Sequence, residues 1–318
     1  MFSDQRCGPR KDRGPGLIAE RLGMDDAMAQ WVIYLLNGLY YAAFIFLISL
    51  GLNIILGVMG VLNLAHGSLY AIGAFMGAWA IIALGKGAPL FFVFASLLSG
   101  LVLAGLVGVV LEWVLIRPIY QRPLEYQLLM TFGVLLVLED GMKVVWGGTG
   151  YYASTPLDRL GTVTILGNPY PLYFLFIIGV SFLTGFLVWL LMTKTRLGIM
   201  LRAVSLDREM ATAMGLHIQR LSTWAFALGA GLAGLAGALV APTTSVLLGF
   251  GTEPLILAFI VVVIGGLGSP KGALIGSLLV GIVRSIGIVK FPEIESAILF
   301  FIAAIILVVK PEGLFGKA

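Results

Sequence analysis

The chain has 318 residues, of which 59% are hydrophobic and only 11% are charged. Soluble domains ordinarily contain about 25% charged residues, so the composition excludes a soluble globular protein. The formal net charge of +4 does not indicate binding to nucleic acid, because basic loops orient membrane proteins and the charges here are spread among loops. The single cysteine, Cys7, excludes an internal disulfide and a cysteine metal cluster.

The N-terminal stretch begins MFSDQRCGPRKDRGPG and is rich in charge. It is not followed directly by a short apolar core with a small-residue cleavage site, so it is not typical of a cleaved signal peptide. We interpret residues 1–26 as a charged, disordered tail. The remainder, residues 27–318, is then a single transmembrane domain.

Residues 27–85 contain no Asp, Glu, Lys or Arg. This run requires more than one membrane crossing, because one helical crossing takes about 20 residues. Further low-charge runs follow to the end of the chain. The sequence therefore predicts an all-α, polytopic membrane protein with about 8–10 transmembrane segments, some of them broken or re-entrant. Small residues at helical spacing, such as Gly73 with Gly77 and Gly231 with Gly234, predict close packing of helices.

Two unexpected polar residues, Asn63 and His66, lie inside this charge-free run. With Gly67 and Tyr70 they have the spacing of one helix face. They either form an interhelical hydrogen bond that only stabilises the bundle, or border a translocation path. Nearby glycines favour the second interpretation, because a helix can loosen at Gly60 and Gly67.

A similar pattern returns late in the chain, where GGLGSPKG (residues 265–272) resembles GVLNLAHG (residues 60–67). Corresponding interruptions in two hydrophobic segments are typical of the central site of a transporter.

Charged residues also occur near the end of a hydrophobic segment at 126–146. Glu139 and Lys143 are spaced to form an intrahelical pair within the membrane region. This pair and Asp140 lie either at the outer interface or in a proton or substrate relay.

Loop charges predict the topology. Residues 112–125 and 194–220 are rich in arginine, whereas residues 147–169 carry only one acidic and one basic residue. The positive-inside rule places the first two loops in the cytoplasm and the third outside, with crossings at about 126–146 and 170–192 between them. The number of crossings before residue 85 stays open.

The cytoplasmic segment 194–220 contains a short amphipathic helix. Ser205 is expected to cap it, and Gly215 is expected to end it as the residue after its C-cap. Such a short helix is unstable alone, so its apolar stripe favours either docking to another protein or packing on the membrane surface. The residues expected in this helix and its flanks are Ser205, Leu206, Asp207, Glu209, Met210, Ala213, Met214 and Gly215.

The chain lacks the motifs GxxxxGK[ST], HExxH and CxxC. Ser68 is two positions from His66, and residues at this spacing do not face each other on a helix. We therefore expect no catalytic residues, no metal site and no cofactor.

Several blocks together resemble one family: GLNIILGVMGVLNLAHGSLYAIGAF, RPLEYQLLMTFGVLLVLEDGMKVVWG, TRLGIMLRAVSLDREMATAMGL and VVVIGGLGSPKGALIGSLLVG. They are similar to the smaller, H-type permease subunits of bacterial branched-chain amino acid ABC importers. Urea and short-amide importers have very similar permeases. Family members often carry amides where this chain has Glu139 and Asp140.

The resemblance implies a non-catalytic permease in the bacterial inner membrane that moves branched-chain or other amino acids, urea or short amides. It implies a second permease subunit, forming a heterodimer with a paralogue, two cytoplasmic ATPase subunits and a periplasmic substrate-binding protein. The segment at 205–215 would then be the helix that contacts the ATPase. The alternative function is a proton-coupled secondary transporter, for which His66, Glu139 and Asp140 are candidate titratable groups. A third hypothesis is a purely structural membrane scaffold, which would not require the polar residues Asn63 and His66.

Overall fold

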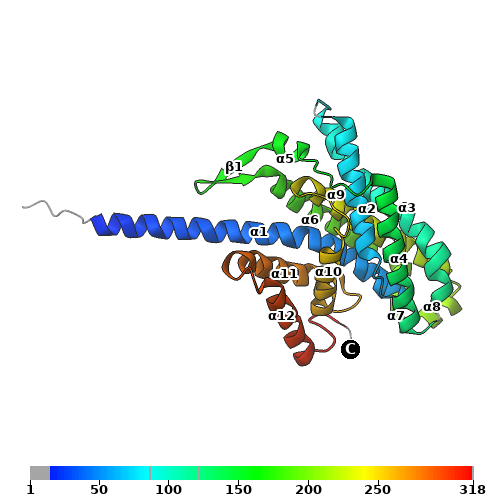
Figure 1. Ribbon diagram of the computed structural model, residues 1–318. Helices are drawn as coiled ribbons and strands as arrows, with labels where there is room; N and C mark the ends of the chain where they lie inside the picture. Colours follow the sequence, from blue (N-terminus) through cyan, green and yellow to red (C-terminus); the bar gives the residue numbers. More distant parts are fainter. Residues whose placement is uncertain (1–14, 86, 121, 317–318) are drawn as a thin grey trace, which may run out of the picture.

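The computed structural model describes residues 15–85, 87–120 and 122–316 (Figure 1). Of the tail expected at residues 1–26, the first 14 lie outside the described part of the chain, and α1 begins at Pro15. In chain order the elements are α1 (Pro15–Met59), α2 (His66–Leu84), α3 (Leu90–Leu111), the π-helical turn η1 (Glu112–Ile116), the 3-10 turn η2 (Arg117–Ile119), α4 (Leu124–Trp146), α5 (Thr155–Leu160), β1 (Thr162–Ile165), β2 (Asn168–Pro171), α6 (Leu172–Lys194), α7 (Arg196–Leu206), α8 (Arg208–Ala213), α9 (Ile218–Val240), the 3-10 turn η3 (Ala241–Thr243), α10 (Thr252–Gly265), α11 (Pro270–Lys290) and α12 (Glu295–Val309).

Six helical segments of the described chain are long and apolar enough to cross a membrane. Two shorter apolar helices, α10 and α12, add to them. The predicted all-α polytopic membrane fold is confirmed, since strands β1 and β2 form only one short antiparallel hairpin. The expected crossing at 126–146 is the exception. It corresponds to α4, which is not among the six because Glu139, Asp140 and Lys143 interrupt its apolar sequence.

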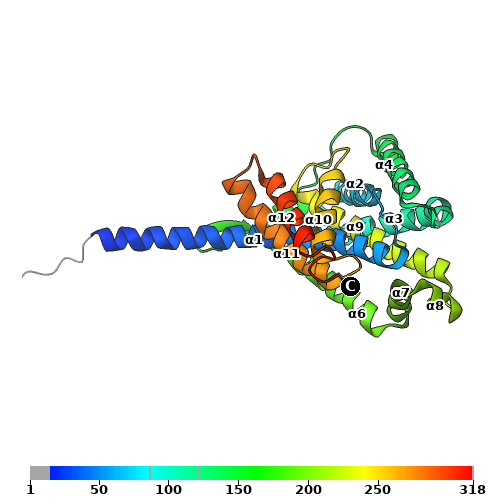
Figure 2. The ribbon, with the colours of Figure 1, turned by 90° about the horizontal axis from the view of Figure 1, so that it is seen from below.

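Helix α1 is 45 residues long. At 1.5 Å per residue it extends about 68 Å, more than twice the thickness of the hydrocarbon layer. Its apolar part is Met28–Met59. In Figures 1 and 2 the N-terminal part of the helix projects beyond the bundle, and its C-terminal part lies among the other helices.

The centre of the bundle is α9, in which residues 229–240 are all buried. Close backbone contacts surround it. A Cβ atom added to Gly73 on α2 would lie 2.1 Å from the Gly234 carbonyl oxygen, and one added to Gly234 would lie 2.4 Å from that of Gly100 on α3. The packing of small residues expected from the sequence is therefore present, and it brings α2, α3 and α9 into direct backbone contact.

The loops separate to two ends of the molecule. At one end, Arg159 donates to the carbonyl of Ala88, and Tyr151 pairs with Val246 in an isolated bridge. At the other end, α7 and α8 lie near the turn at Tyr120, where the Arg208 guanidinium is 5.2 Å from the centre of the tyrosine ring. The grouping of 112–125 with 194–220, apart from 147–169, agrees with the alternation of loops expected from their charges (Figure 1).

Candidate functional site

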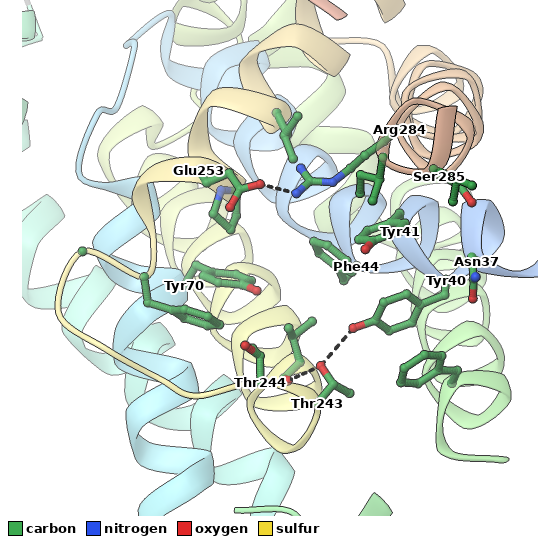
Figure 3. A pocket seen from close by; sticks show the side chains of 18 residues that line it. Asn37, Tyr40, Tyr41, Phe44, Tyr70, Thr243, Thr244, Glu253, Arg284 and Ser285 are labelled. Atoms are coloured by element: carbon green, nitrogen blue, oxygen red, sulfur yellow. Dashed lines mark hydrogen bonds and ion pairs between the residues drawn. The ribbon is translucent and has the colours of Figure 1, made fainter. Parts of the chain in front are cut away.

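A cavity of about 560 Å³ lies beside α1, between η3, α10 and α11 (Figure 3). Its size is that of a small-molecule site. Its walls combine aromatic rings with a few polar side chains. The aromatic residues are Tyr40, Tyr41, Phe44, Tyr70, Phe174 and Phe250, and the polar or charged residues are Asn37, Thr243, Thr244, Glu253, Arg284 and Ser285.

One arginine connects three helices at this cavity. Arg284 on α11 forms an ion pair with Glu253 at the start of α10. Its Nε atom lies 3.7 Å from Oε1 of Glu295 on α12, and its guanidinium lies 5.1 Å from the centre of the Tyr41 ring. Arg284 and Glu295 are mostly buried, whereas the Glu253 side chain is 69% exposed. The cavity therefore offers both a cation and an accessible carboxylate within one small space.

The opposite wall is held by hydrogen bonds. Thr243 donates its hydroxyl hydrogen to the carbonyl of Val240, so the Tyr40 hydroxyl is the donor to Thr243 Oγ1, at 2.9 Å. The Tyr40 ring also stacks on Phe174, with 4.3 Å between the ring centres. Figure 3 shows the Tyr40 hydroxyl directed at Thr243, on the side of the cavity away from Arg284 and Glu253.

Of the four residues expected to border a path, only Tyr70 lines this cavity. Asn63 does not share a helix face with the others, because it lies in the break before α2 and its Oδ1 accepts from the backbone of Ala65. His66 is the first residue of α2, and its Nε2 lies 3.0 Å from the carbonyl oxygen of Ile48 on α1. A carbonyl can only accept, so Nε2 carries the hydrogen. Asn63 and His66 are completely buried, and their Nδ2 and Nδ1 atoms have no hydrogen-bond partner.

Gly67, where the sequence pattern allowed a helix to loosen, instead lies inside α2, and it permits a close contact at the other side of that helix. A Cβ atom there would lie 2.6 Å from the carbonyl oxygen of Gly251. Next to it is a space of only about 10 Å³, which Glu139 also lines. The pair expected between Glu139 and Lys143 is not among the ion pairs of the described residues. Glu139 borders this space, whereas the Lys143 side chain is exposed.

The two similar segments at 60–67 and 265–272 both interrupt helices. Gly60 ends α1 with φ +67°, and Gly266 ends α10 with φ +99°. The second break packs on α1, where the Asn53 amide accepts from Gly268 N at 2.6 Å and donates to Ser269 O at 3.0 Å.

Sequence reasoning missed four residues at these places: Asn53, Tyr40, Glu253 and Arg284. Asn53 could have been identified from the sequence, because it is another asparagine within the charge-free run that contains Asn63. Arg284 had one too, since it interrupts the apolar sequence of α11.

In the segment 194–220, Asp207 caps α8, since its side chain accepts from Met210 N at 2.8 Å. The expectation that Ser205 is the cap was wrong: its hydroxyl donates to the carbonyl of Arg202, in the last turn of α7. The helix ends as expected at Gly215, which has φ +82° and a Schellman pattern of hydrogen bonds.

The apolar stripe points outward, with Leu206 66%, Met210 60% and Met214 77% exposed. Glu209 and Ala213, which were also expected in this segment, are exposed as well.

Comparison with known proteins identifies transport permeases. A sequence model described as "Branched-chain amino acid transport system / permease component" matches residues 34–309. The chain is 27% identical over 291 residues to the high-affinity branched-chain amino acid transport system permease protein BraD of Pseudomonas aeruginosa, covering 89% of this chain and 95% of that protein. It is 26% identical to the corresponding LivH protein of Escherichia coli, covering 92% and 98%. It is also 25% identical to the permease protein LivM of Salmonella typhimurium, covering 84% and 67%.

Proposed function

Because the chain belongs to the family of permease components of branched-chain amino acid transport systems, we propose that it is a permease subunit of an ATP-driven importer in the bacterial inner membrane. The multi-pass helical fold supports the membrane location. In this proposal the chain itself performs no chemical step and holds no cofactor. Its bundle forms the path, and separate cytoplasmic ATPase subunits hydrolyse ATP.

Three kinds of partner complete the importer: a second permease, two ATPases and a periplasmic binding protein. The similarity to both a LivH and a LivM protein supports a heterodimer of related permeases. The stripe of Leu206, Met210 and Met214 supports contact with an ATPase, because three large apolar side chains are exposed on one short helix and its two flanks.

The cavity supports an amino acid as the solute, and this is the observation on which the substrate proposal rests. A free amino acid carries a carboxylate and an ammonium group, which suit Arg284 and Glu253. The aromatic wall around Tyr40 suits an apolar side chain. Urea and short amides have no charge for either group, so the same cavity suits them less well.

We assign Tyr70 to the path, because its side chain lines the cavity. Asn63 and His66 receive a different role from the one that their sequence pattern favoured. His66 bonds to the Ile48 carbonyl and Asn63 to the turn before α2. Both would therefore fix the break between α1 and α2, at the border of the path rather than within it.

The proposal is tested by reconstituting the permease into vesicles with its second permease, ATPases and binding protein. Uptake of leucine should require ATP hydrolysis and should persist when a protonophore collapses the proton gradient. A non-hydrolysable ATP analogue serves as the control. Uptake driven by a pH gradient in the absence of the ATPases would instead establish the proton-coupled secondary transporter.

A further inference from the structure

A completely buried carboxylate lies where α3 passes into the π-helical turn η1. Glu112 is 0% exposed, and both of its oxygens are occupied. Oε2 accepts from Arg117 Nη2 at 3.1 Å and from Thr223 Oγ1 on α9 at 2.7 Å. Oε1 accepts from the Tyr120 hydroxyl and from Arg117 Nε at 3.4 Å. Burying a carboxylate costs free energy unless its oxygens accept hydrogen bonds from the protein, because no water reaches them.

The geometry makes Glu112 the centre of a rigid cluster. Arg117 Nη2 also donates to Thr223 Oγ1 at 2.9 Å, so the arginine, the threonine and the carboxylate contact one another in a closed triangle. The triangle joins η1 and η2 to α9. A π-helical turn inside a helix is often found at functional positions, since it redirects the side chains that follow.

Tyr120 is the outer edge of this cluster. Burial and the neighbouring Glu112 carboxylate raise the pKa of its hydroxyl, which therefore stays a neutral donor. Because the hydroxyl is held by Glu112, the ring has a fixed orientation. The guanidinium of Arg208 lies over that ring, 5.2 Å from its centre, a separation at which a cation is attracted to an aromatic face.

Arg208 is the first residue of α8, directly after the capping residue Asp207. On the inward side of α8, Ala211 is buried, whereas Met210 and Met214 point outward. The Arg208–Tyr120 contact therefore connects the inner side of the exposed helix to the buried cluster in the membrane bundle.

We propose that Glu112 and Tyr120 are positioning residues for energy coupling: they hold a platform on which Arg208 seats α8, so that movement of α8 is passed to α3 and α9. This inference rests on the proposed function, in which an ATPase moves α8. Neither residue lines the cavity beside α1. Their effect is on how many solute molecules are moved for each ATP hydrolysed.

The test is the ratio of leucine transported to ATP hydrolysed by the complete complex in vesicles. Arg208→Gln removes the charge of the side chain and keeps it polar, at a position outside the core. We expect an assembled complex that still hydrolyses ATP, with a transport ratio lowered about tenfold. Arg208→Lys restores a cation over the ring and should recover most of the ratio.

Tyr120→Leu, which removes the platform, should lower the ratio as Arg208→Gln does, and Tyr120→Phe, which keeps the ring, should lower it less. Tyr126→Leu is the matched control, because Tyr126 is an exposed tyrosine at the start of α4.

If Tyr120→Leu does not assemble, the two Arg208 variants decide alone. A ratio within twofold of the wild type for Arg208→Gln, or equal ratios for Gln and Lys, would overturn the inference. The wild-type complex distinguishes this failure from failure of the proposed function, since without ATP-driven transport by the wild type the function itself is wrong.

Discussion

Arg284 and His66 are both polar side chains in apolar helices, but their surroundings differ. Arg284 faces a cavity and has two carboxylates near it, Glu253 and Glu295. His66 faces the backbone of α1 and is completely buried. A polar group inside a membrane bundle needs a partner in either case. The partners of Arg284 are side-chain carboxylates beside a cavity, whereas the partner of His66 is a fixed backbone carbonyl.

Replacing Arg284 by Gln is expected to lower the rate of leucine uptake at saturating binding protein by tenfold or more. The carboxylate of the solute loses its only guanidinium partner in the cavity, and a neutral amide attracts it less. Lys290→Gln is the matched control, because Lys290 is an exposed cation at the end of the same helix. Uptake by Arg284→Gln within twofold of the wild type would remove the arginine from solute recognition.

Replacing His66 by Leu is expected to destabilise the protein by about 0.5–1.5 kcal/mol, because the hydrogen bond from the imidazole to the Ile48 carbonyl is lost. The thermal unfolding midpoint in detergent measures this loss, and transport per folded protein should stay within twofold. His217→Leu, at the other histidine, should have little effect, since that side chain is exposed. The opposite pattern, normal stability with strongly reduced transport, would return His66 to the path as its sequence pattern favoured.

Helix α8 is an element of six residues that depends on its ends and on one buried side. Asp207 satisfies a free backbone donor at its start, and the Schellman pattern around Gly215 satisfies free carbonyls at its end. So short a helix is not stable in water alone. Its contact through Ala211 and Arg208 with the rest of the protein keeps it folded, and leaves its methionines exposed.

Replacing Met210 and Met214 together by Asp is expected to leave the permease in the membrane but to prevent the ATPase from co-purifying with it. Two unpaired carboxylates would have to enter an apolar surface of the partner. Leu166→Asp provides the control, since Leu166 is an exposed apolar residue in the hairpin at the other end of the molecule. Normal co-purification and transport by the double variant would show that α8 does not contact the ATPase.

At the scale of the whole molecule, the loops separate into two groups by charge and by position. The group with α7, α8 and Tyr120 is rich in arginine, and the group with the β1–β2 hairpin is not. The hairpin has its own antiparallel ladder and adjoins α6, and three of the four residues of β1 are exposed. Such a separation is what the positive-inside rule requires of a protein inserted in one orientation.

The orientation is tested with single cysteines in a Cys7→Ser background, which has no other cysteine. Thr164→Cys in the hairpin should react with a membrane-impermeant thiol reagent added to spheroplasts. Thr212→Cys in α8 should react only after the membrane is permeabilised. Both positions are exposed in the structure, so accessibility within the protein is matched. The reverse labelling pattern would invert the topology and place α8 away from a cytoplasmic ATPase.

The sequence by itself determined the features that depend on local composition and spacing. The scarcity of charge required a membrane bundle, Gly60 and the segment 265–272 marked helix breaks, and Gly215 marked the end of α8. The outward stripe on α8 and the resemblance to the permease family were also readable. For the structural features among these, the physical cause acts within a few residues, through solvation, backbone conformation or helical periodicity.

Only the tertiary structure decided which polar groups meet. Asn53 bonds to a loop 215 positions away, and Arg284 meets Glu253 and Glu295 across three helices. The turn at Asn63 separated it from the helix face that its spacing suggested, and Asp207 displaced Ser205 as the cap of α8. Spacing along the chain predicts neighbours only while one helix continues. Beyond a break, the partner of a polar group is set by how closely packed helices bring distant backbones together, as Gly73, Gly100 and Gly234 do here.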